Sequence, residues 1–193
     1  MRYVKRIVIG MCIAAAAVFL ITSVEKSAKQ DKNAPQIKST SDEIRVKCSA
    51  SEAELLAGVT AEDKEDGNLT DKIRIGNHSR FESPGVCDLE YLVFDSGYNV
   101  GKYTRRVIYT DYRPPVFSIS QPLEYQVNER VQILDRITAS DCLEGDISNR
   151  MRVVDGNVDA SKEGTYMVTV EVSNSYGDVV SQNLPVYIRR GGQ

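Results

Sequence analysis

An acidic cluster, Asp63, Glu65 and Asp66, precedes the turn-forming pair Gly67 and Asn68. Carboxylate and amide oxygens are the ligands that calcium prefers, and the ion takes about six to eight of them. The spacing differs from that of an EF-hand loop, and Asp-Gly sequences commonly form turns whose side chains accept hydrogen bonds from backbone N–H groups. Asp63 and Asp66 are therefore candidate calcium ligands. A self-capped turn is the competing interpretation, and the spacing favours it.

The sequence contains four cysteines, of which Cys12 lies in an apolar N-terminal segment. Cys48 and Cys87 both belong to the first copy of an internal repeat, and the second copy lacks both. This joint presence and absence predicts a disulfide between Cys48 and Cys87. Closing a loop of about 40 residues in this way stabilises a domain by roughly 4 kcal/mol. Two buried free thiols are the alternative, and Cys142 is then either an inert loop thiol or an intermolecular link.

His78 is the only histidine and lies in the polar segment 76–79. A Ser–His–Asp triad would have to use it, but no G-x-S-x-G sequence accompanies it. The chain has 27 acidic residues, and no spacing singles out a pair of the kind that a glycosidase needs. We therefore predict no catalytic residue, no cofactor and no enzymatic activity.

Charge argues against a nucleic-acid partner. The chain has 24 Lys and Arg against 27 Asp and Glu, and a formal net charge of −3. Three of the basic residues, Arg2, Lys5 and Arg6, lie at the N-terminus, so the remainder is still more acidic. Nucleic-acid affinity comes mainly from Lys and Arg that displace counterions from phosphates. We expect no nucleic acid as a partner.

Residues 7–24 contain no charged residue and follow two basic ones. As a helix they span about 27 Å, enough for a thin bilayer and longer than a secretory signal core of about 7–15 residues. We predict an uncleaved signal-anchor that contacts the membrane through residues 7–24, with cleavage as the alternative. The basic flank places the N-terminus in the cytoplasm and the C-terminal domains outside the cell. The predicted localisation is the cell membrane, with a single pass.

An internal repeat organises the rest of the chain. Residues 56–63 (LAGVTAED) align with residues 134–141 (LDRITASD), and the same offset carries residues 66–69 (DGNL) onto 144–147 (EGDI). We predict a cytoplasmic stub and transmembrane segment at 1–26, a stalk at 27–33, and domains at 34–112 and 113–190.

Within each copy, apolar and polar residues alternate, as in residues 86–93 and 165–172. Such alternation is typical of half-buried strands, and many short strands separated by Gly, Pro, Asn and Asp predict an antiparallel β-sandwich. The one helical segment expected after the N-terminal region is 51–56, where Ser51 precedes Glu54 by three residues, as in a capping box.

Five motifs carry a resemblance to a known family: A-P-x-I at 34–37, G-V-T-A-x-D at 58–63, D-G-x-L-T at 66–70, P-G at 84–85, and Y-x-V-x-D-S-G-x-N at 91–99. They resemble the bacterial surface immunoglobulin-like domain family whose name comes from a pesticidal crystal protein. The second copy departs from the pattern at Asn174, where the first has an aspartate at the strand end. The resemblance implies an all-β chain of two tandem immunoglobulin-like antiparallel β-sandwiches after the N-terminal transmembrane helix.

The resemblance also implies structural or adhesive modules without enzymatic activity, and it implies no particular ligand. We therefore expect a non-enzymatic, membrane-anchored bacterial surface protein that acts as a binding or spacer module for an unknown protein or glycan ligand. The alternative is a structural subunit of a cell-envelope assembly that pairs with a partner through its β-edge strands. A hydrolase or a calcium-dependent adhesin is a third hypothesis.

Overall fold

The computed structural model describes residue 3, residue 11, residues 15–20 and residues 32–191 of the 193-residue chain. Most of the predicted membrane segment 7–24, and of the predicted stalk 27–33, lies outside these residues. Within the described part, no helix is long and apolar enough to cross a membrane. The structure thus contradicts the predicted single-pass cell-membrane localisation with a cytoplasmic N-terminus, and we do not retain it.

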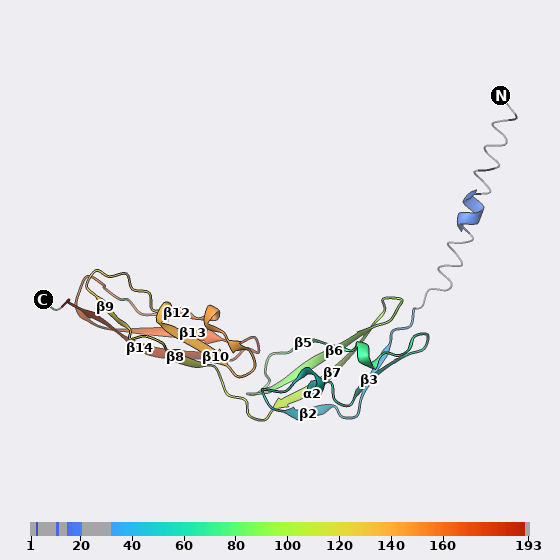
Figure 1. The fold of residues 1–193 in the computed structure, drawn as a ribbon, viewed down its shortest axis with the longest axis horizontal. Helices are drawn as coiled ribbons and strands as arrows, with labels where there is room; N and C mark the ends of the chain where they lie inside the picture. Colours follow the sequence, from blue (N-terminus) through green and yellow to red (C-terminus); the bar gives the residue numbers. More distant parts are fainter. Residues whose placement is uncertain (1–2, 4–10, 12–14, 21–31, 192–193) are drawn as a thin grey trace. The chain divides into compact units, whose positions relative to one another are not determined.

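The described chain is predominantly β, as predicted (Figure 1). The elements of the first repeat are β1(Gln36–Ser39), β2(Glu43–Val46), α2(Glu52–Leu55), β3(Val59–Asp63), β4(Gly67–Asn68), η1(Thr70–Lys72), β5(Arg74–His78), β6(Val86–Phe94) and β7(Val100–Tyr109). Those of the second are β8(Val116–Ile119), β9(Glu124–Gln126), η2(Leu134–Arg136), β10(Ile137–Asp141), β11(Gly145–Asp146), η3(Ser148–Arg150), β12(Arg152–Asp155), β13(Gly164–Ser173) and β14(Val179–Arg189).

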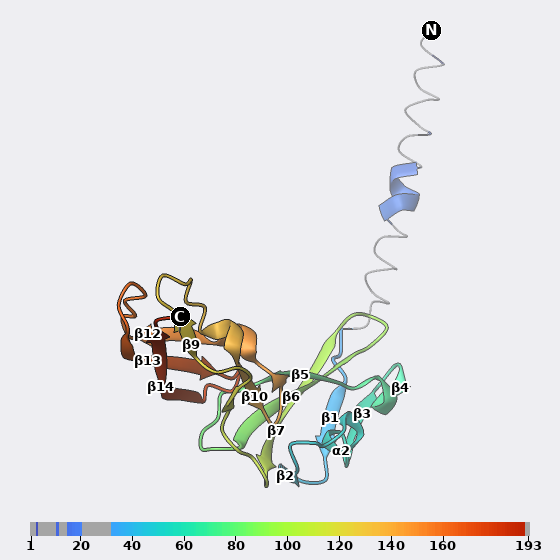
Figure 2. The ribbon, with the colours of Figure 1, turned by 60° about the vertical axis from the view of Figure 1, so that its left-hand side comes forward.

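The two repeats have the same strand order. In the first, a three-stranded sheet runs β1-β3-β4 and a four-stranded sheet runs β2-β7-β6-β5 (Figure 2). In the second, the corresponding sheets run β8-β10-β11 and β9-β14-β13-β12. The pairs β2 with β7 and β9 with β14 are both parallel. The duplication in the sequence is therefore a duplication of topology.

Alternating side chains build the core of the second repeat. Leu184, Val186 and Ile188 of β14 are buried, with Ile137 and Ala139 of β10 in the same cluster. Because these residues come from both sheets, the core lies between two sheets packed face to face. The arrangement has the character of a β-sandwich.

The same alternation buries an aspartate at the end of one strand in each repeat. Inward positions of β3 are Val59, Ala61 and Asp63, and the corresponding strand β10 ends with inward Asp141. Asp63 and Asp141 are 8% and 5% exposed. Because alternate side chains of a strand point to the same face, each carboxylate follows the apolar residues and lies at the edge of the core. A buried carboxylate there needs a polar partner.

The capping box predicted for the short helix is confirmed. The Ser51 side chain accepts a hydrogen bond from the Glu54 N–H, and Glu54 Oε2 accepts one from the Ser51 N–H at 2.8 Å. Both bonds satisfy N–H groups that have no partner within the helix. The helix α2 begins where these two residues predict.

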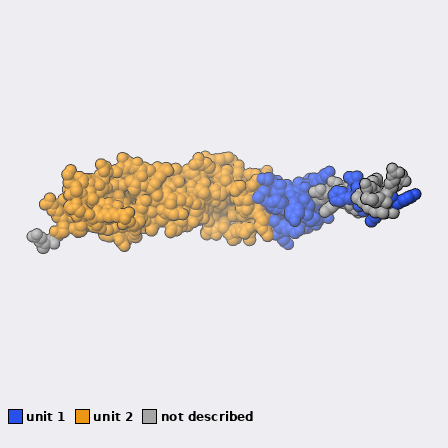
Figure 3. Space-filling model, turned by 90° about the horizontal axis from the view of Figure 1, so that it is seen from above, with its two compact units in different colours: residues 1–38, 60–73, 92–102 blue, residues 39–59, 74–91, 103–193 orange. Residues whose placement is uncertain are grey.

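The chain divides into two compact units (Figure 3). Unit 1 comprises residues 1–38, 60–73 and 92–102, and unit 2 comprises residues 39–59, 74–91 and 103–193. The division runs through the first repeat, and unit 2 includes the whole second repeat together with residues 39–59, 74–91 and 103–112 of the first. The domain boundaries 34–112 and 113–190 stay predictions.

Candidate functional site

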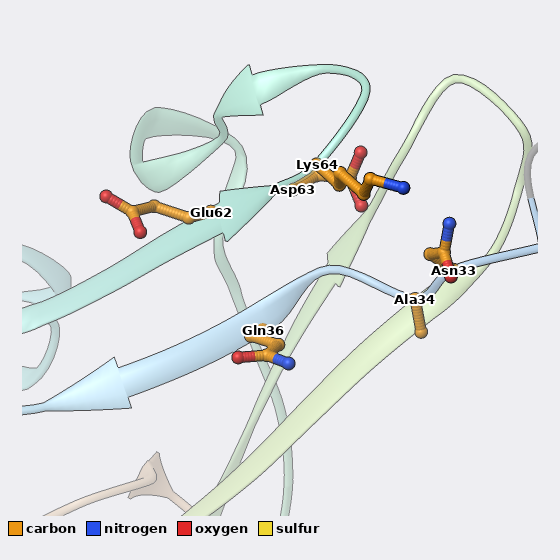
Figure 4. Close-up of a pocket in the computed structure, with 6 residues that line it drawn as sticks. All are labelled: Asn33, Ala34, Gln36, Glu62, Asp63 and Lys64. Atoms are coloured by element: carbon orange, nitrogen blue, oxygen red, sulfur yellow. The ribbon is translucent and has the colours of Figure 1, made fainter.

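Unit 1 contains a polar cavity of about 350 Å³, lined by residues before and within β1 and at the end of β3 (Figure 4). The lining comprises Asn33, Ala34, Gln36, Glu62, Asp63 and Lys64. In Figure 4 the Lys64 side chain points toward the side on which Asn33 lies, and the Glu62 carboxylate points away from both. Amides, carboxylates and an amine make this a surface for hydrogen bonding with a polar ligand.

Asp63 is the buried member of this lining. Its Oδ1 atom accepts hydrogen bonds from the N–H groups of Glu65 and Asp66, each at 2.9 Å. Its Oδ2 atom is also buried and has no hydrogen-bond partner among the described residues. Leaving a buried acceptor unpaired costs about 1–3 kcal/mol, and more for a charged group. One oxygen of Asp63 thus caps the turn, and the other is a buried acceptor that no described donor satisfies.

Asp66 connects the β3–β4 turn to the turn between β6 and β7. Its Oδ2 atom accepts from the Ser96 N–H at 2.5 Å, and its Oδ1 atom accepts from the Ser96 hydroxyl at 2.9 Å. These hydrogen bonds lower the pKa of the Asp66 carboxyl, because they favour the charged form. Glu65 accepts a bond from Asn33 Nδ2 at 3.3 Å.

Asp95 closes the β6–β7 turn in the same unit. It is 6% exposed, its Oδ1 atom accepts from the Asn99 N–H, and its Oδ2 atom accepts from Asn99 Nδ2, each at 2.7 Å. Unit 1 therefore contains two buried aspartates at strand ends, and neither carries a donor that could satisfy the other.

These contacts match the turn-capping interpretation of the acidic cluster. In the part of the chain that the structure describes, no group of three or more His, Cys, Asp or Glu side chains could hold a metal ion. Three of the four carboxylate oxygens of Asp63 and Asp66 already accept hydrogen bonds, and the donors belong to Glu65, Asp66 and Ser96. Calcium binding at Asp63 and Asp66 stays an untested prediction.

The structure does not support the predicted disulfide between Cys48 and Cys87. Both are free thiols, as is Cys142. Cys87 points into the core from β6, where burial and the nearby Asp88 charge raise the pKa of its thiol to about 11. Cys48 lies in the turn after β2, and burial together with the neighbouring Cys142 thiol raises the pKa of its own thiol. Cys48 and Cys142 thus belong to different repeats, and the spacing of the cysteines in the sequence does not predict that they are neighbours.

His78 lies at the end of β5 and not in a polar loop. Its ring stacks on Tyr176, with ring centroids 3.9 Å apart and an interplanar angle of 16°. Its Nε2 atom lies 3.2 Å from the Ser175 hydroxyl, and its Nδ1 atom lies 3.0 Å from the Ser79 carbonyl oxygen. A carbonyl and not a carboxylate orients the ring, so the pair lacks the third member of a triad. The contacts join the first repeat to the second within unit 2.

No protein-family profile matches the chain. The pesticidal crystal protein Cry22Aa of Bacillus thuringiensis is 31% identical over 133 residues, which are 66% of this chain and 18% of that protein. The chain is distantly homologous to it and spans about a fifth of its length. The resemblance to a pesticidal crystal protein is thus confirmed as distant homology, whereas membership of an immunoglobulin-like family is not confirmed.

Two solved structures are similar at low scores. The CBM51-2 and INT domains of ZmpB from Clostridium perfringens share 23% identity over 45% of this chain and 21% of that one, with a TM-score of 0.30. The lipoprotein BT2262 from Bacteroides thetaiotaomicron shares 12% identity over 79% of this chain and 80% of that one, with a TM-score of 0.28. These likenesses assign the chain to no family.

Proposed function

We propose that this chain is a non-enzymatic binding module made of two immunoglobulin-like β-sandwich domains, residues 34–112 and 113–190. The identical strand order of the two repeats supports the pair of domains, and the distant homology to a pesticidal crystal protein agrees with it. The observation that carries the binding function is the Asp63 Oδ2 atom, a buried acceptor without a partner in a residue that lines a polar cavity.

The lining favours a polyhydroxylated ligand such as a saccharide. Sugar hydroxyls donate to carboxylates, and they both donate to and accept from the Asn33 and Gln36 amides. A hydroxyl donated to Asp63 Oδ2 would form a charge-assisted bond, which is stronger than a hydrogen bond between neutral groups. Lys64 adds a donor for a ring or hydroxyl oxygen.

The size of the cavity sets the scale of the affinity. A volume of about 350 Å³ lies at the small end of ligand pockets. At about 0.3 kcal/mol per non-hydrogen atom, one sugar ring of roughly 12 to 15 such atoms gains about 4 kcal/mol, a dissociation constant of about 1 mM. The useful affinity of the module would then come from binding several sugars of one glycan or from repeated modules.

Ligand-observed NMR tests the proposal. The full chain is titrated with N-acetylglucosamine, glucose, galactose and mannose, and the Asp63→Asn variant is titrated in parallel. Losing a charge-assisted hydrogen bond should weaken the bound sugar about 10- to 100-fold. Glu52→Gln, on the exposed first turn of α2, is the charge-matched control and should bind as the wild type does. Equal affinities of wild type and Asp63→Asn for every sugar would contradict the proposal.

A second function is favoured by β12, an edge strand of the β9-β14-β13-β12 sheet. All four of its residues are exposed, and Val153 and Val154 are 45% and 46% exposed. Exposed apolar side chains on an open strand edge are suited to pairing with a strand of another protein. The chain would then be a structural subunit of an assembly. Recovery of one stoichiometric protein partner, lost on Val154→Lys, would favour this function over glycan binding.

A further inference from the structure

Two cysteines lie on either side of the segment that joins the two repeats. The Cys48 N–H donates to Asp111 Oδ1 at 2.7 Å, and the Cys142 thiol donates to the Arg113 carbonyl oxygen at 3.7 Å. Asp111 and Arg113 are two residues apart in the connector. Both cysteines are therefore held to the same short connector, residues 111–113, and the Cys142 thiol lies close enough to influence the ionisation of the Cys48 thiol.

Other contacts of unit 2 keep this junction closed. Tyr112, between the two anchoring residues, donates its hydroxyl to Asp178 Oδ2 at 2.7 Å and packs edge-on against Phe81. The Phe81 N–H donates to the Tyr176 carbonyl oxygen at 2.8 Å, and their rings stack with centroids 4.6 Å apart. The noncovalent junction thus holds the two thiols together, which gives each a high effective concentration near the other.

We propose that Cys48 and Cys142 are a redox-active pair that forms a disulfide between the first and second repeats. The bridge would join the turn after β2 to the turn between β10 and β11. Cys87 would stay reduced, because it is buried in the core of the first repeat.

The oxidant is a second disulfide, supplied by a small thiol or another protein. Cys142 is exposed and meets the donor first: its sulfur attacks one sulfur of the donor disulfide and releases one donor thiol. The Cys48 sulfur then attacks the resulting mixed disulfide and releases the second donor thiol. The two protein thiols lose two electrons and two protons, and the donor disulfide gains them.

The surroundings fit this order of events. Burial, the neighbouring Cys142 thiol and the Asp111 carboxylate all raise the pKa of the Cys48 thiol. A thiol with a raised pKa is seldom present as the attacking thiolate. Cys48 is therefore the resolving cysteine, and its proximity to Cys142 compensates for its low reactivity.

Mass spectrometry after thiol trapping tests the proposal. The reduced full chain is incubated with oxidised glutathione, alkylated under denaturing conditions and digested. The expected product is a peptide pair linked through Cys48 and Cys142, with Cys87 alkylated. A Cys48–Cys87 link, a dimer linked through Cys142, or only glutathione adducts at Cys142 would overturn the proposal.

Thermal unfolding provides the second readout. Oxidation should raise the Tm of the wild type by several degrees, because the bridge closes a loop of about 95 residues, and dithiothreitol should reverse the rise. Cys87→Ser is the matched control and should keep the rise, whereas Cys48→Ser and Cys142→Ser should both lose it. A rise of equal size in Cys142→Ser would contradict the assignment.

Discussion

Asn174 donates a hydrogen bond from Nδ2 to Asp141 Oδ2 at 3.1 Å, and both side chains are buried. Asp141 Oδ1 accepts from the Leu143 and Glu144 N–H groups, so both of its oxygens are satisfied. The equivalent positions of the first repeat hold Asp63 and Asp95, two carboxylates that cannot donate to each other. In the second repeat, both oxygens of Asp141 thus have donors within the repeat. In the first repeat, no described donor satisfies Asp63 Oδ2, so a ligand could supply one.

The second repeat should not tolerate a carboxylate at position 174. Asn174→Asp removes the donor to Asp141 Oδ2 and places two carboxylates together in the core edge. We expect a loss of about 2–4 kcal/mol in the free energy of unfolding at neutral pH, measured by urea denaturation. A variant as stable as the wild type at pH 7 would contradict the account of this pair.

The converse substitution in the first repeat should satisfy Asp63. Asp95→Asn retains an oxygen for the Asn99 N–H and supplies an amide donor in the place that Asn174 has in the second repeat, although it removes the acceptor of the Asn99 Nδ2 bond. We expect sugar binding to weaken, because the new amide competes with the ligand for Asp63 Oδ2. Calorimetric titration measures the change in affinity. Stronger sugar binding in this variant would disprove the competition.

The tyrosine between the repeats should contribute through its hydroxyl. Tyr112 Oη donates to Asp178 and accepts from Asn174 Nδ2 at 2.9 Å. Tyr112→Phe keeps the ring and removes both bonds, so we expect a loss of about 1–3 kcal/mol in unfolding free energy. Tyr98, which is 88% exposed, is the matched control. Tyr98→Phe should change stability by less than about 0.5 kcal/mol.

Acid should destabilise the chain in part through Glu144. Burial alone would raise the pKa of this carboxyl, but hydrogen bonds from Arg150 and from the Ser175 N–H outweigh it and lower the pKa below its usual 4.5. The folded state therefore binds the proton less readily than the unfolded state. The stabilisation that ionised Glu144 contributes is complete at pH values above the pKa that this carboxyl has in the unfolded state. It is lost as the pH falls through the lower pKa of the folded state.

Glu144→Gln should accordingly flatten the fall in unfolding free energy between about pH 5 and pH 3. Arg150→Gln forms the second arm of this experiment, since it removes the bidentate partner at 2.8 and 3.0 Å. It should destabilise the chain at pH 7 and have little effect at pH 3. An unchanged pH profile in both variants would show that the ion pair is not linked to folding.

Local patterns in the sequence predicted much of the fold. The period-two alternation of 86–93 and 165–172 marks β6 and β13, and the aligned repeats foretell the shared strand order. Ser51 and Glu54 predict the start of α2 because a capping box involves residues only three apart. Each of these signals depends on neighbours in the chain.

The site was only partly predictable, since its decisive contacts join distant residues. The Asp63 turn cap follows from the local Asp-Gly sequence, but the unpaired Oδ2 atom depends on which residue stands at position 95. The Cys48–Cys142 contact and the His78–Tyr176 stack link different repeats. No spacing within one repeat encodes them. The predicted Cys48–Cys87 bridge is not supported, since both cysteines are free thiols.

A backbone amide NMR titration tests the central claim most directly. The ¹⁵N-labelled chain is titrated with the sugar that binds most tightly among the four tested, and chemical-shift changes are mapped onto the sequence. Our account predicts that the largest changes fall on residues 33–36 and 62–66 and disappear in Asp63→Asn. Changes centred elsewhere in the chain, or an identical map in Asp63→Asn, would contradict a ligand site at this carboxylate.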